Sequence, residues 1–296
     1  MDLIEIQQIV AQYIKIDYTS KRTKETVFLF DNNQLSGLAR AAKKNLAEVQ
    51  YLLSANRLDD KDIIIPSSVL WETGKNLPNQ AAYLNLYQPI FEELSDRSNI
   101  YIMTTEEAFN IFSSSYENKV QAFDLFKSIA VEMNRGHLDL KDDLQKVKNI
   151  QAFDEALHRE EDDLGERQAF LIMAALIEDR MEYVEFGSNE HAGVYLKIEN
   201  YAMQDDLLRL MKIPDSKTFM ELFRVRSLNA LVGETIISNS TWDFSRIGTF
   251  LDAVRHSHYF SSPVIYHHTT GGASRKLTNQ ELCQLFKSFP TLNLLF

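Results

Sequence analysis

Short continuous apolar runs alternate along the chain with longer stretches in which apolar residues recur at helical spacing. The runs VFLFD (27–31), III (63–65) and NIYIM (99–103) are bounded by polar residues, which predicts buried strands of a parallel sheet. A fourth strand is predicted at GVYLKIEN (193–200). Because helical stretches separate these runs, the order predicts a central parallel sheet with right-handed crossovers.

Apolar residues three and four positions apart predict the helices between the strands. The pattern is clearest after residue 31, where Leu35, Leu38 and Ala42 share one face of a long helix. Near residue 67 a serine can cap the helix that follows the second strand. Other helices are predicted within 3–18, at 87–97, from 105, at 164–179, at 246–256 and at 279–289, with one further strand at 263–268.

A helical and highly charged region follows the third strand. It carries apolar residues at helical spacing, namely Phe112, Val120, Phe123, Phe126, Ile129 and Met133. We therefore predict an insertion of helices that stand off the sheet and narrow access to its edge. The predicted fold class is α/β, a central parallel sheet flanked by helices, predominantly helical overall. The predicted organisation is an N-terminal helix and connection (1–26), an α/β domain (27–226) with a helical insertion at about 112–160, and a C-terminal α+β extension (227–296).

Composition limits where the protein can work. Apolar residues make up 45% of the chain and charged residues 25%, which are globular values. The single cysteine, Cys283, cannot form an internal disulfide, and no Cys/His spacing suggests a zinc site, so a reducing compartment fits. The N-terminus lacks the pattern of a signal peptide, and no run approaches the roughly 20 apolar residues of a membrane span. We expect a cytoplasmic protein with no membrane partner.

The net charge of −11 argues against broad attraction to nucleic acid, because such binding depends on Lys and Arg side chains that neutralise phosphates. Acidic metal sites, however, add negative charge that bound cations offset. Basic residues also cluster at Lys15–Lys24, Arg40–Lys44 and Arg224–Arg226. A local basic face, and with it an RNA or other nucleic-acid partner, remains compatible with the sequence.

Four acidic residues fall where predicted strands lead into helices. Asp31 and Glu199 stand at strand ends, and Glu72 and Glu166 stand in the first turns of helices. In an open parallel sheet these positions share the carboxyl edge, so we expect Asp31, Glu72 and Glu166 to converge within metal-bridging reach. Clustered carboxylates need a counter-charge, and Mg²⁺ or Mn²⁺ prefers carboxylate and water oxygens.

Four segments together resemble the PIN-like nucleases. FLFDNNQL resembles the opening strand with its terminal Asp, IIIPSSVLWET the second strand and its Glu-bearing helix, LGERQAFLIMAAL the acidic helix start, and VYLKIENYAMQDDL the last acid. The resemblance covers roughly 27–226, apart from the helical insertion. The third and fourth acids of the family are more often Asp, and neighbours of Glu166 and Glu199 could take their place. These neighbours are Asp162, Asp163 and Asn200.

The resemblance implies a metal-dependent phosphodiesterase, an endoribonuclease in which a Mg²⁺- or Mn²⁺-activated water attacks phosphorus. Asp31 and Glu166 would hold one ion, and Glu72 and Glu199 would complete its ligands. Asn32, Ser68 and Asn200 are candidates to orient the ligands or to contact phosphate.

Two other interpretations stay open. Acids at helix starts are commonly caps or partners of the helix dipole, so a catalytically inactive PIN-like module that binds a protein partner also fits. A metal-dependent phosphatase is a third possibility, but phosphoaspartyl hydrolases place a second Asp two residues after the first, where Asn33 stands.

Overall fold

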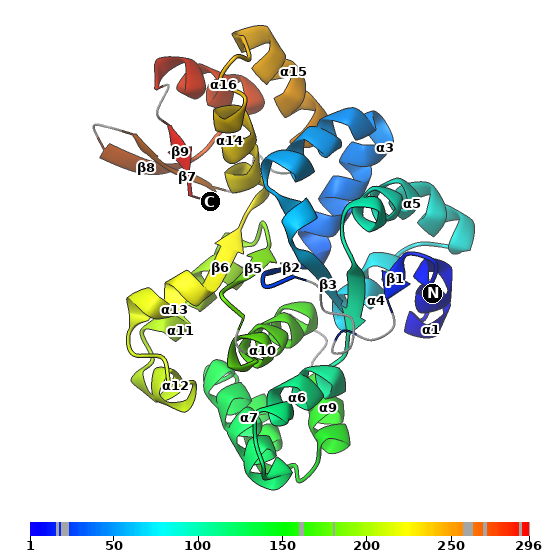
Figure 1. Cartoon of the computed structure of the whole chain (residues 1–296), viewed down its shortest axis with the longest axis vertical. Helices are drawn as coiled ribbons and strands as arrows, with labels where there is room; N and C mark the ends of the chain where they lie inside the picture. The colour runs from blue at the N-terminus through cyan, green and yellow to red at the C-terminus, as the bar shows by residue number, and fades with distance from the viewer. Residues whose placement is uncertain are drawn as a thin grey trace.

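The computed structural model describes residues 1–15, 18, 24–159, 163–179, 181–256, 263–268, 271–289 and 292–295. Its centre is a six-stranded, all-parallel sheet in the order β1-β4-β3-β2-β5-β6 (Figure 1). The strands are β1 (Ile14–Lys15), β2 (Val27–Phe30), β3 (Asp62–Pro66), β4 (Ile100–Met103), β5 (Val184–Gly187) and β6 (Phe223–Arg226). The predicted α/β class, a parallel sheet with helices around it, is confirmed.

Helices cover both faces of the sheet, and alternate side chains of each strand enter opposite cores. Val27 and Leu29 of β2 belong to one buried cluster, and Phe28 and Phe30 belong to the other. The first cluster includes residues of α6 (Thr105–Ser114), α7 (Lys119–Met133), α8 (Leu138–Lys146), α9 (Ile150–His158), α10 (Leu164–Glu178), α11 (Leu196–Ala202), α12 (Asp205–Leu210) and α13 (Ser216–Leu222). The second includes residues of α1 (Leu3–Val10), α3 (Asn32–Ala55), α4 (Ser67–Lys75), α5 (Gln80–Arg97), α14 (Leu228–Ser238), α15 (Phe244–Val254) and α16 (Asn279–Ser288).

Two short helical turns complete these layers, a 3-10 turn at Leu58–Asp60 and a π-helical turn at His191–Tyr195. Within the described residues, no helix is both long enough and apolar enough to cross a membrane.

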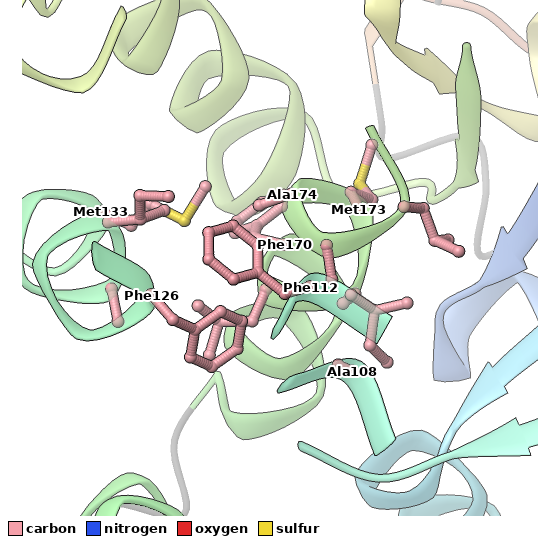
Figure 2. Packing of buried hydrophobic residues seen from close by; sticks show 14 of the residues in the cluster. Ala108, Phe112, Phe126, Met133, Phe170, Met173 and Ala174 are labelled. Atoms are coloured by element: carbon pink, nitrogen blue, oxygen red, sulfur yellow. The ribbon is translucent and has the colours of Figure 1, made fainter. Parts of the chain in front are cut away.

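The predicted helical insertion is present, and it adds no strand within the described residues of the region 112–159. Its helices α7, α8 and α9 pack beside α6 and α10 on one side of the sheet. Figure 2 shows Phe112 of α6 and Phe126 of α7 close to Phe170 of α10. The insertion is therefore part of the same hydrophobic core as the sheet, not a separate lobe.

The C-terminal segment forms a second, antiparallel sheet of three strands, in the order β8-β7-β9. These strands are β7 (Pro263–His268), β8 (Gly271–Lys276) and β9 (Asn293–Leu294). Val264 and Tyr266 of β7 are buried in the cluster that also holds Phe28 and Phe30. The helix predicted at 246–256, the strand at 263–268 and the helix at 279–289 are found within two residues of the expected bounds.

The strand predicted at 193–200 is wrong. These residues form the end of the π-helical turn and most of α11, and they bury Val194 and Ile198 at helical spacing. GVYLKIEN resembles a strand because its apolar residues fall at every second position, but only Val194 and Ile198, four residues apart, are buried, and Leu196 is exposed. The helix predicted within 3–18 ends at Val10, and β1 follows it.

Strand β5 takes the place of the strand that was predicted at 193–200. The sequence pattern does not predict β5, because a charged residue interrupts its apolar run. Glu185 is 2% exposed in the middle of β5. Its carboxylate accepts hydrogen bonds from Lys61 Nζ (2.7 Å) and from the Arg226 guanidinium (3.2 Å). A buried carboxylate is tolerated when it is paired in this way. Strand β6, which supplies Arg226, was not predicted either.

Replacing Phe126 tests whether the insertion shares the core. Its ring lies 5.3–5.6 Å from the rings of Phe109, Phe112 and Phe153, and it is 0% exposed. Phe126→Ala should lower the free energy of unfolding by about 3–5 kcal/mol, because it leaves a cavity among these rings. Denaturant titration followed by circular dichroism should show one transition at a lower midpoint.

Val120→Ala, on the same helix but at a position 70% exposed, provides the matched control and should change stability by less than about 0.5 kcal/mol. An early, separate transition of part of the helical signal in Phe126→Ala would contradict a shared core.

Candidate functional site

An acidic pocket of about 260 Å³ lies at the carboxyl edge of the sheet, where the strands lead into helices. Asp31 follows β2 directly, Glu72 stands on α4 just after β3, and Glu166 stands in the first turn of α10. All three line the pocket, so the structure brings these predicted residues together. The pocket is lined by Asp31, Asn32, Asn33, Val69, Glu72, Asp163, Gly165, Glu166, Glu190 and Gly193.

Asp31 is the most rigidly held of these acids. It is the N-cap of α3, and its Oδ1 accepts a hydrogen bond from the Gln34 N–H (2.6 Å). The Ser188 hydroxyl, which follows β5, donates to Oδ2. Burial raises the pKa of Asp31 to about 7, although both hydrogen bonds oppose the rise, and the charges of Glu166 and Glu190 add to it. The carboxyl is thus fixed in orientation but costly to ionise.

Glu72 and Glu166 face the pocket from neighbouring helices. Burial raises the pKa of Glu72 to about 7, against a hydrogen bond from the Gly165 backbone that lowers it. Glycines make room for both carboxylates, because a Cβ at Gly165 would lie 3.0 Å from Glu72 Oε1 and a Cβ at Gly193 2.9 Å from Glu166 Oε1. A side chain at either position would crowd the carboxylate oxygens.

Lys197 of α11 supplies positive charge beside the pocket. Its Nζ lies 2.9 Å from Asp163 Oδ2 and 3.0 Å from Glu166 Oε2. Burial lowers the pKa of Lys197, but the hydrogen bonds to both acids outweigh it and the pKa is raised. Burial likewise raises the pKa of Glu166, and Lys197 opposes that shift. One side-chain ammonium group beside the pocket is therefore shared between two of the pocket's carboxylates.

Glu190 is the acid that the sequence analysis missed. It follows β5, lines the pocket, and accepts a hydrogen bond from Asn33 Nδ2. An acid soon after a buried strand is the signal that identified Asp31, and it would have identified Glu190 had β5 been recognised. Ser188, which holds Asp31, was missed for the same reason.

The other predicted site residues do not converge on the pocket in the same way. Glu199 lies on α11, where its carboxylate forms a hydrogen bond with Tyr195, and it does not line the pocket. The Ser68 hydroxyl donates to Gln168 Oε1 (2.6 Å). Asn32 lines the pocket, Asn200 lines a larger neighbouring cavity, and Asp162 lies outside the described residues.

The carboxylates share a pocket, yet they are not arranged as a finished metal site. Across the residues that the structure describes, no three His, Cys, Asp or Glu side chains are positioned to hold one metal ion. Convergence of the three carboxylates within metal-bridging reach stays a prediction. Ionised carboxylates that face one another without a cation repel, and here Glu166 turns to Lys197.

Asp31→Asn should make the protein more stable at alkaline pH. With a folded pKa of about 7 against an ordinary 3.8, Asp31 weakens the native state progressively as pH rises between these values. Asn keeps the cap but carries no charge, so the variant should gain stability over the wild type from about pH 4 to about pH 8, by at most about 4 kcal/mol. Melting temperatures measured across this range would test the claim. A difference in melting temperature between the variant and the wild type that is the same at pH 4 and at pH 8 would contradict it.

Comparisons with protein-family models, with curated proteins and with solved structures found no match for this chain.

Proposed function

We propose that the protein is a metal-dependent phosphodiesterase of the PIN-like type, a ribonuclease that uses Mg²⁺ or Mn²⁺. The observation that carries the proposal is the acidic pocket itself. Asp31, Glu72, Glu166 and Glu190 line one small hollow at the carboxyl edge of a parallel sheet. Ligands of open α/β sheets bind at this edge, and carboxylate oxygens are the ligands that these cations prefer.

The donor set fits a hard divalent cation. Burial raises the pKa of two of the carboxyls, those of Asp31 and Glu72, to about 7, so ionising them is costly and a bound cation would offset that cost. Asp31, Glu72 and Glu166 would hold the ion, and Glu190 takes the place that the sequence analysis gave to Glu199. The pocket of about 260 Å³ is smaller than a typical ligand site of roughly 300–1,000 Å³, so it suits an ion, water and a phosphate group.

The protein's own side chains would orient the reacting groups. Ser188 and the Gln34 N–H hold both oxygens of Asp31, and Asn33 holds Glu190, so these carboxylates cannot swing freely. Lys197, released from Glu166, could then face an anionic phosphate oxygen. When bound, Mg²⁺ or Mn²⁺ would lower the pKa of the attacking water and offset negative charge on the phosphate.

The proposal places the protein in the cytoplasm, with RNA as substrate. Its one cysteine, Cys283, is buried and unpaired, as suits a reducing compartment.

A second candidate is a catalytically inactive PIN-like module that binds a protein partner. The Lys197 bridge favours it, because an ammonium bonded to both Asp163 and Glu166 can stabilise the acids without any metal. The net charge of −11 points the same way, since it disfavours long stretches of nucleic acid.

Removal of one pocket carboxylate separates the two candidates. Asp31→Asn should reduce Mn²⁺-dependent cleavage of single-stranded RNA by at least about a hundredfold, because it removes ligand charge while it keeps the cap. Glu199→Gln is the matched control and should cleave like the wild type, since Glu199 lies outside the pocket. Cleavage would be measured on a labelled oligonucleotide with and without EDTA.

Thermal melting gives an independent readout of metal binding. At a Mn²⁺ concentration a hundredfold above Kd, the wild type should gain about 2.7 kcal/mol and Asp31→Asn much less. A wild type that neither cleaves RNA nor melts at a higher temperature with Mn²⁺ or Mg²⁺ would favour the inactive module.

A further inference from the structure

We propose that the cavity beside the acidic pocket binds a nucleotide of the single-stranded substrate adjacent to the cleaved phosphate. This inference rests on the proposed function and deepens it, because it names where the strand is held. The cavity measures about 790 Å³ and lies between the turn that joins α7 to α8 and the helices α10 and α11. The helical insertion therefore forms one wall.

The cavity and the acidic pocket meet at Lys197 and the two acids that it contacts. Lys197 lines the cavity, and its Nζ bonds to Asp163 and Glu166, which line the pocket. A ligand in the cavity that contacts Lys197 would therefore be separated from these two carboxylates by one side chain. The acidic pocket is too small to hold a base as well as a phosphate, so a neighbouring nucleotide has to be bound outside it.

Basic side chains from two parts of the chain line the cavity. Arg135 and His137 come from the insertion turn, and Arg167 comes from α10. Two of them act on the pocket, because the pKa of Asp163 is lowered first by the hydrogen bond from Lys197, then by the charge of Lys197, and further by Arg167 and His137. Arg135 is exposed, and within the described residues its guanidinium has no ion-pair partner. Such a group suits a phosphate.

The floor of the cavity is apolar and aromatic. Phe170 and Tyr201, whose rings lie 5.3 Å apart edge to face, both line it and are almost fully buried. Met203 stands at the rim and is 69% exposed, although it is a large apolar side chain. Cations beside an apolar surface match the two halves of a nucleotide, since the phosphate needs charge and the base needs a flat apolar contact.

Two acids also line the cavity, so it is not a uniformly basic surface. Asp206 forms an ion pair with Arg209 (2.7 Å), which offsets its charge, and Asp205 is exposed beside it. A long polyanion would be repelled there, whereas one nucleotide near Arg135 and Lys197 would not. This arrangement favours short contact with a single strand over tracking along a duplex.

Binding without catalysis tests the inference directly. Fluorescence anisotropy of a short labelled single-stranded RNA would be followed in EDTA over a range of salt concentrations. Arg135→Gln should weaken binding about tenfold and lower the slope of log K against log salt by about 0.7, the value for one lost phosphate contact on a single strand. Met203→Ser should weaken binding and leave the slope unchanged, because it removes only an apolar contact.

Arg159→Gln is the matched control. Arg159 lies in the same insertion and pairs with Asp143 at the surface, but it does not line the cavity, so its variant should bind like the wild type. A nucleoside 5′-monophosphate should compete better than inorganic phosphate. Equal effects of Arg135→Gln and Arg159→Gln, or equal competition by phosphate alone, would overturn the inference.

The outcome is separable from that of the proposed function. RNA binding in EDTA with the predicted variant effects, but no cleavage in Mn²⁺, would refute the nuclease and leave the nucleotide site. The opposite outcome is that both Arg135→Gln and Met203→Ser cleave RNA in Mn²⁺ and bind RNA in EDTA as the wild type does. That outcome would refute the nucleotide site and leave the nuclease.

Discussion

The electrostatic repulsion among carboxylates at one edge of the sheet is the constraint on which the site depends. Parallel strands all end at the same edge, so acids that follow β2, β3 and β5 are brought together whether or not their charges are compensated. Burial of Asp31 and Glu72 raises the free-energy cost of ionising them. In this arrangement Lys197 offsets the charge of Asp163 and Glu166, whereas burial keeps the pKa of Glu72 raised although the charge of Lys75 lowers it. A divalent ion would complete that compensation.

The helical insertion links this edge to the rest of the molecule. Its helices are anchored in the core through Phe126, and the turn after α7 projects Arg135 and His137 toward α11. A cationic, partly aromatic cavity thus stands next to an acidic pocket, with Lys197 between them. The negative net charge of the chain does not contradict the binding of one nucleotide, because Arg135, Arg167 and Lys197 line the cavity in which it would lie.

The sequence predicts those parts of the fold that depend on local patterns. Uninterrupted apolar runs marked β2, β3 and β4, and an acid at a strand end or helix start located Asp31 and Glu166. Strand β5 could not be recognised, because Glu185 in its middle is neutralised by partners far away in sequence. Because β5 is not recognised, the sequence predicts Glu199, and not Glu190, as the fourth acid of the site. The bridge from Lys197 depends on how α10 and α11 pack, which no local pattern encodes.

The most direct test is anomalous X-ray scattering from a crystal soaked in Mn²⁺ at slightly alkaline pH, where the pocket carboxyls ionise. The account predicts a Mn²⁺ peak bonded to oxygens of Asp31 and Glu166, with the Lys197 ammonium moved away from its present position 3.0 Å from Glu166. Absence of a peak, with Lys197 still bonded to both Asp163 and Glu166, would contradict a metal-dependent enzyme and leave the acids as a purely structural ion-pair cluster.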